Sequence, residues 1–135
     1  MKVAVRYYSR SGNTKAIAEA IASILHVSAI SVDDPDSRFA QPVDVLFIGG
    51  ALYAYGIDSH LKEYMKSLSS DNVKKAVIFS TSWVSKHAID IMKKTLSQKG
   101  IPVVDDFFYV RTKVGNKLSP DQLKQAEEFA LKHTK

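Results

Sequence analysis

The chain has 135 residues, of which 45% are hydrophobic and 24% charged, as expected of one globular domain covering residues 1–135. Its lack of cysteine excludes disulfides, thiolate metal sites, iron–sulfur clusters and cysteine nucleophiles. The formal net charge is +5, but the cations are scattered and no apolar run is long enough for a signal peptide or a membrane span. We therefore expect a cytoplasmic protein that binds neither nucleic acid nor membrane.

Strand and helix patterns alternate along the sequence. Apolar runs predict strands at residues 2–8, 27–32, 43–48, 76–80 and 103–110. Apolar residues at helical spacing predict helices at 13–25, 59–68 and 85–98, and a last helix that begins at Ser119-Pro120-Asp121. Between the second and third strands, residues 33–37 indicate a turn in place of a helix. The predicted fold is α/β: a doubly wound five-stranded parallel sheet in the order 2-1-3-4-5, with helices on both faces and a second helix that is short or missing.

The most informative motif is Ser9-Arg10-Ser11-Gly12-Asn13-Thr14, which joins the first strand to the first helix. It supplies three hydroxyls, one amide side chain and one glycine. Since the first N–H groups of a helix are unpaired and the helix dipole adds positive charge there, this loop suits a phosphate group. Its glycine spacing is that of neither a Walker A loop nor a dinucleotide fingerprint. The same residues are also common in turns and helix caps. The hexamer alone is therefore equally consistent with a loop that binds no ligand.

Two further loops are expected at the same edge of the sheet. Gly49-Gly50-Ala51-Leu52-Tyr53-Ala54-Tyr55-Gly56 follows the third strand, and Ser80-Thr81-Ser82-Trp83 ends the fourth. In sheets of this order, ligands bind beyond the carboxyl ends of the strands, near the switch point between strands one and three. The three loops therefore predict one shared binding site.

With these loops in this order, the chain resembles a flavodoxin of the short-chain type over essentially its whole length. The resemblance implies an electron-transfer flavoprotein that binds FMN, with the phosphate on the hexamer and the flavin ring between the two later loops. No metal is implied, and no side chain need act as acid, base or nucleophile, because the redox chemistry belongs to the cofactor. The implied cofactor-binding residues are Ser9, Arg10, Ser11, Gly12, Asn13, Thr14, Ala51, Leu52, Tyr53, Tyr55, Gly56, Ser80, Thr81, Ser82 and Trp83.

Several of these residues have a plainer interpretation. Trp83 could stack on the flavin ring or simply pack, and we favour stacking because a loop tryptophan has little local core to join. One of Tyr53 and Tyr55 is expected to face the ring and the other to pack at the strand end. Arg10 could neutralise the phosphate, although a solvated arginine is favoured. Asp58 is the nearest candidate for an acidic residue beside the ring.

The basic charge departs from the acidic character of many flavodoxins and favours a redox protein partner with an acidic docking face. Two other functions remain open. The first is a flavin-dependent reductase or oxidase that acts on a quinone or porphyrinogen. The run Ala54-Tyr55-Gly56 resembles the Arg-Tyr-Gly loop of such enzymes, with alanine in place of arginine. The second is a flavodoxin-like interaction protein, such as an activator that docks on a ribonucleotide reductase.

Overall fold

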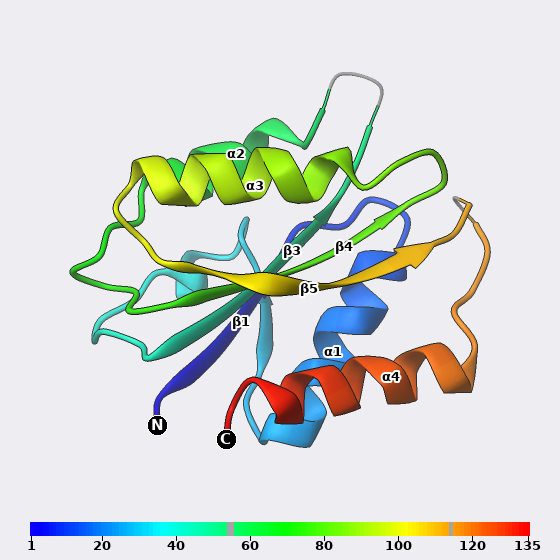
Figure 1. The fold of residues 1–135 in the computed structure, drawn as a ribbon, viewed down its shortest axis with the longest axis horizontal. Helices are drawn as coiled ribbons and strands as arrows, with labels where there is room; N and C mark the ends of the chain where they lie inside the picture. Colours follow the sequence, from blue (N-terminus) through cyan, green and yellow to red (C-terminus); the bar gives the residue numbers. More distant parts are fainter. Residues whose placement is uncertain (54–55, 114) are drawn as a thin grey trace.

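The computed structural model describes residues 1–53, 56–113 and 115–135, and within them a parallel sheet lies between two layers of helices (Figure 1). The strands are β1 (Val3–Tyr7), β2 (Ala29–Ser31), β3 (Val45–Ala51), β4 (Ala76–Ser82) and β5 (Val103–Arg111). Their order in the sheet is β2-β1-β3-β4-β5, and each neighbouring pair is parallel. The predicted fold class and strand order are confirmed.

The helices are α1 (Asn13–Leu25), α2 (Ser59–Lys66), α3 (His87–Gln98) and α4 (Pro120–Lys132). Helices α1 and α4 cover one face of the sheet, and α2 and α3 cover the other (Figure 1). Successive residues of β3 serve the two cores in turn: Phe47 packs with the α1 and α4 layer, whereas Leu46 and Ile48 pack with the α2 and α3 layer. This alternation explains why β3 is a continuous apolar run, as a strand buried on both faces must be.

Between β2 and β3, where the second helix was expected to be short or missing, the chain forms only a short 3₁₀ turn, η1 (Pro35–Ser37). Arg6 of β1 helps to hold this segment on the sheet. Its side chain is buried, its Nε donates to the Ser37 carbonyl at 2.8 Å, and its guanidinium lies 4.7 Å from the centre of the Phe39 ring. The Tyr64 hydroxyl of α2 donates to the same carbonyl at 2.5 Å. A buried arginine thus connects the sheet to the segment that replaces the helix.

The third strand is longer than predicted, because Gly49 and Gly50 belong to β3 and not to the loop that follows it. A Cβ at Gly49 would lie 2.1 Å from the Phe79 ring, and a Cβ at Gly50 would lie 2.2 Å from the Leu61 side chain. The two glycines therefore serve close packing on both faces of the sheet, where the sequence alone suggested a turn.

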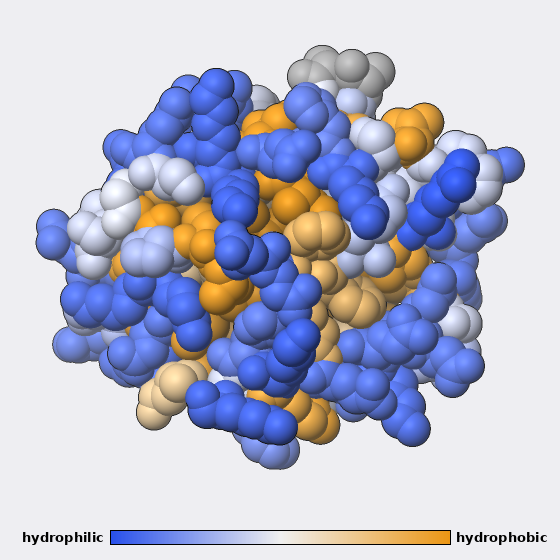
Figure 2. Space-filling model, in the orientation of Figure 1, coloured by the Kyte–Doolittle hydropathy of each residue, from blue (hydrophilic) through white to orange (hydrophobic). Residues whose placement is uncertain are grey.

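Strand β5 forms one edge of the sheet, and Figure 2 shows hydrophobic side chains between hydrophilic ones over the part of the molecule where β5 runs. Its two adjacent carboxylates point to opposite faces. Asp105 pairs with Lys93 of α3 at 3.2 Å, whereas Asp106 accepts from Lys132 at 3.0 Å and contacts the His133 ring at 2.9 Å. These carboxylates therefore cannot form a paired acid–base site. Within the described ranges, no helix is long and apolar enough to span a membrane.

Candidate functional site

A cavity of about 320 Å³ lies at the carboxyl ends of the strands, within the size range of small-molecule sites, roughly 300–1,000 Å³. It joins the three predicted loops. Its lining residues are Ser11, Asn13, Ala51, Leu52, Tyr53, Thr81, Ser82, Trp83, Val84 and Thr112. Val84 and Thr112 were not predicted. A larger hollow of about 520 Å³ lies against α2 and α3, but five of its eight lining residues are lysine, histidine or aspartate, which suits a solvated surface.

The predicted phosphate loop enters α1 through Gly12, which is the N-cap residue and has φ +96°, a left-handed conformation that glycine adopts readily. The Gly12 amide donates to Ser9 Oγ at 3.0 Å, so the Ser9 hydroxyl folds back onto the loop. Gly12 has no side chain that could cap the helix. The first-turn N–H groups of α1 therefore receive no cap from this position, where a phosphate could accept from them.

Thr14 joins the phosphate loop to the end of β4. Its Oγ1 lies 2.8 Å from Thr81 Oγ1, and both side chains are buried. Whichever hydroxyl accepts in this pair keeps its own hydrogen for another acceptor. The Asn13 amide donates to the Lys113 carbonyl at 3.3 Å, which connects the same loop to the turn after β5.

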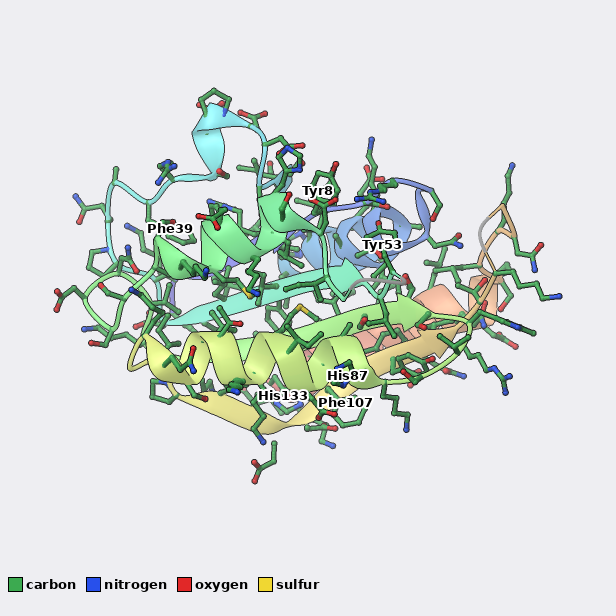
Figure 3. All side chains as sticks on the ribbon, turned by 90° about the horizontal axis from the view of Figure 1, so that it is seen from above. Tyr8, Phe39, Tyr53, His87, Phe107 and His133 are labelled. Carbon is green, nitrogen blue, oxygen red and sulfur yellow. The ribbon has the colours of Figure 1, made fainter. Side chains whose placement is uncertain are left out.

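The loop after β3 carries Tyr53, which lies at the end of the strand (Figure 3) and lines the cavity. Tyr53 and Gly56 exchange two backbone hydrogen bonds, of 2.7 and 3.0 Å, and Gly56 has φ +112°. The Arg10 guanidinium lies 4.1 Å from the centre of the Tyr53 ring. Burial raises the pKa of the Tyr53 hydroxyl, and the nearby Arg10 charge only partly opposes this effect. Tyr55 lies outside the described residues.

Arg10 differs from expectation, because it is not simply solvated. It forms an ion pair with Asp58, which is only 3% exposed, and its Nε donates to the carboxylate at 3.1 Å. Asp58 also caps α2 by accepting from the His60 amide at 2.7 Å, and the His60 ring lies 2.8 Å away. Burial raises the pKa of Asp58, but the hydrogen bonds from His60 and Arg10 outweigh it, so the pKa lies below its usual value. Asp58 does not line the cavity.

Trp83 is 46% exposed and lines the cavity from the loop after β4. Arg111 and Lys113 lie 4.7 and 4.6 Å from the centre of its ring. Arg111 Nε also donates to the Trp83 carbonyl at 2.9 Å. Sequence reasoning missed both cations, because Arg111 ends β5 and Lys113 lies in the segment after it, and the spacing of neither residue indicates a neighbour at Trp83.

Some predicted residues lie away from the cavity or also line a second hollow. Ser80 is buried, and its hydroxyl donates to the Gly50 carbonyl at 2.6 Å, so it connects β4 to β3 and does not line the cavity. Ser11, Gly12 and Asn13 line a neighbouring hollow of about 440 Å³ that lies against residues 115–118. No three histidine or acidic side chains in the described part of the chain are grouped so that they could hold a metal ion.

Comparisons with known proteins agree with this architecture. The flavodoxin domain model matches residues 4–126. A flavodoxin from the domain Archaea is 22% identical, with a TM-score of 0.80 over 98% of this chain and 95% of that one. Flavodoxin 1 from Bacillus cereus is 21% identical, with a TM-score of 0.78 over the whole of both chains.

Part of a longer protein shares the fold as well. Rubredoxin oxygen:oxidoreductase from Desulfovibrio gigas is 17% identical, with a TM-score of 0.77 over 96% of this chain and 34% of that longer chain. A search of curated proteins finds no match. At these identities the structural likeness establishes the fold, whereas the domain model covers most of the sequence. The chain therefore belongs to the flavodoxin family.

Proposed function

We propose that the chain binds FMN non-covalently in the cavity at the carboxyl edge and transfers electrons through it. The observation that carries the proposal is that this one cavity combines the start of α1 with the ends of β3 and β4. Membership of the flavodoxin family supports a flavin as the cofactor. When bound, FMN would supply the redox chemistry, and the protein would supply binding, electrostatics and access.

The residues present suit the different parts of FMN. The uncapped start of α1 and the hydroxyls of Ser11, Thr14 and Thr81 suit the phosphate and the ribityl chain, which need hydrogen-bond partners. Ala51 and Leu52 give the cavity an apolar side, and Trp83 adds an aromatic surface for a flat ring system. The lining near α1 is thus polar, whereas the end of β3 is apolar and the end of β4 combines the hydroxyls of Thr81 and Ser82 with the Trp83 ring that follows them.

An electron carrier is favoured over a substrate-specific reductase or oxidase. The described residues that line the cavity include no carboxylate, histidine or lysine. Their one phenol is that of Tyr53, and because burial raises its pKa it is a weak proton donor for a quinone or porphyrinogen. The likeness to part of an oxidoreductase chain supports a redox role in which a partner protein exchanges the electrons. The net charge of +5 favours a partner with an acidic face.

The proposal is tested by titrating the apoprotein with FMN and with riboflavin, which lacks the phosphate. FMN should bind far more tightly, and equal affinities would refute the phosphate assignment. Thr14→Val should weaken FMN by roughly 1.5–3 kcal/mol, as for a lost hydrogen bond to a charged group, and should change riboflavin little. Thr95→Val is the matched control, because Thr95 is also a buried threonine, hydrogen-bonded at 2.8 Å to the Ile91 carbonyl of α3, away from the cavity.

A further inference from the structure

Exposed apolar side chains are gathered beside the cavity. Trp83 is 46% exposed and its neighbour Val84 is 77% exposed, whereas the other exposed large apolar residues of the described chain, Met1 and Leu131, lie near the termini. Both Trp83 and Val84 also line the cavity. An exposed apolar pair at the mouth of a cofactor site is a feature that a partner protein can cover.

Three cations surround this pair and are held against aromatic rings. Arg111 and Lys113 lie over Trp83, and Arg111 also donates to the Trp83 carbonyl at 2.9 Å. Lys86 lies 5.4 Å from the centre of the Phe107 ring and 5.6 Å from that of Tyr109. Cations packed on aromatic faces are partly ordered before binding, so ordering them in a complex costs less.

Among the described residues, no carboxylate forms an ion pair with any of these three cations. Asp58 is buried and paired with Arg10, so its charge is already balanced. Asp90 of α3 is exposed, but it lies 3.9 Å from His87 and does not line the cavity. We call the set Trp83, Val84, Lys86, Arg111 and Lys113 the basic rim.

We propose that the basic rim is the docking surface for a redox protein whose own docking face is acidic around an apolar centre. This rests on the proposed function, because the surface matters for electron transfer only if the cavity beside it holds a flavin. Opposite charges steer encounter and fix orientation, and the apolar pair supplies the contact that excludes water. Part of the net charge of +5 would thus act at the basic rim by attracting the partner, although the cations are scattered along the sequence.

The test measures electron transfer to the FMN-loaded protein from a reduced acidic [2Fe–2S] ferredoxin, by stopped-flow absorbance at low and high ionic strength. The variant K86Q/R111Q/K113Q removes the three rim charges. The matched control K2Q/K74Q/K99Q removes three exposed charges, which lie just before β1, just before β4 and at the end of α3. These positions are at the amino ends of the strands, opposite the cavity. We expect the rim variant to be slower by about tenfold or more at low ionic strength and the control by less than about threefold. Salt should abolish the difference, because exposed charges are screened.

Equal slowing by the two triple variants, or a wild-type rate that rises with salt, overturns the proposal. Oxidation of the reduced, FMN-loaded protein by a basic ferric cytochrome c that is faster at low than at high ionic strength also overturns it, because it would show attraction to a basic partner. Because Arg111 supports Trp83, the variant V84D/K86Q provides a second test that leaves both ring contacts of Trp83 in place, and it too should slow the ferredoxin reaction. Flavin absorbance separates the two proposals: wild-type protein that binds no flavin refutes the proposed function, whereas rim variants that bind flavin and react at the wild-type rate refute the docking surface alone.

Discussion

Replacing Asp58 separates two roles that one carboxylate performs. It caps α2 through the His60 amide at 2.7 Å, and it pairs with Arg10. Asp58→Asn keeps an acceptor for the cap and removes the charge, whereas Asp58→Ala removes both. The lost cap costs about 1 kcal/mol, with a range of roughly 0.5–2. Because the Arg10 side chain is 46% exposed, solvent screens the ion pair, which contributes about 0.5–1 kcal/mol. We expect losses of about 0.5–1 kcal/mol for Asp58→Asn and about 1–3 kcal/mol for Asp58→Ala.

The effect of pH follows from the lowered pKa of Asp58. As the pH falls, the unfolded chain takes up the proton first, near the ordinary aspartate pKa of about 4. The charge of Asp58 therefore stabilises the folded state above that pH, and this stabilisation is lost as the pH falls through the lower folded-state pKa. The difference in free energy of unfolding between the wild type and Asp58→Asn should shrink on acidification below about pH 4.

Urea unfolding followed by far-UV circular dichroism, near neutral pH and in acid, measures both effects. Asp71→Asn is the control, because Asp71 is an exposed aspartate outside the helices and far from the Arg10 pair. If Asp58→Asn is as stable as the wild type near neutral pH, or if the difference widens in acid, the Asp58 charge does not stabilise the fold. If Asp58→Ala loses no more stability than Asp58→Asn, the cap contributes nothing.

Two further predictions concern Trp83 and the paired glycines of β3. FMN should strongly quench the fluorescence of Trp83, the single tryptophan of the chain. Trp83→Ala should weaken FMN binding by about 0.5–1.5 kcal/mol. Fluorescence that is the same with and without FMN would assign Trp83 to packing alone. Gly49→Ala should destabilise the fold by about 1–3 kcal/mol in thermal or urea unfolding. It should cost more than Gly50→Ala, because a Cβ at position 49 would lie within 2.6 Å of three atoms of the Phe79 ring, whereas a Cβ at position 50 would meet only one Leu61 methyl carbon as closely, at 2.2 Å. The reverse ranking would contradict this reason.

The sequence predicted the strands and helices because periodicity and turn residues are local signals. It predicted where the loops meet because the carboxyl ends of parallel strands lie at one edge of the sheet. The sequence could not predict contacts between distant residues. Arg10 and Asp58 are 48 positions apart, and nothing near Arg10 indicates that a buried carboxylate will meet it. The end of β3 was misplaced for a related reason: Gly49 and Gly50 have the composition of a turn, and only the packing of Phe79 and Leu61 shows why a strand needs them.

Net charge alone says little about the field at a binding site, because one buried carboxylate beside the cofactor can outweigh several distant cations. Asp58 was the acidic residue whose negative charge could have made the electrostatic field at this cavity negative. The structure pairs it with Arg10, so these two charges cancel at the loop after β3. The charges left at the mouth of the cavity are those of Lys86, Arg111 and Lys113, each held against an aromatic ring. We therefore expect the local field to have the same sign as the net charge of +5, and to favour an anionic form of a cofactor bound there as well as an acidic partner.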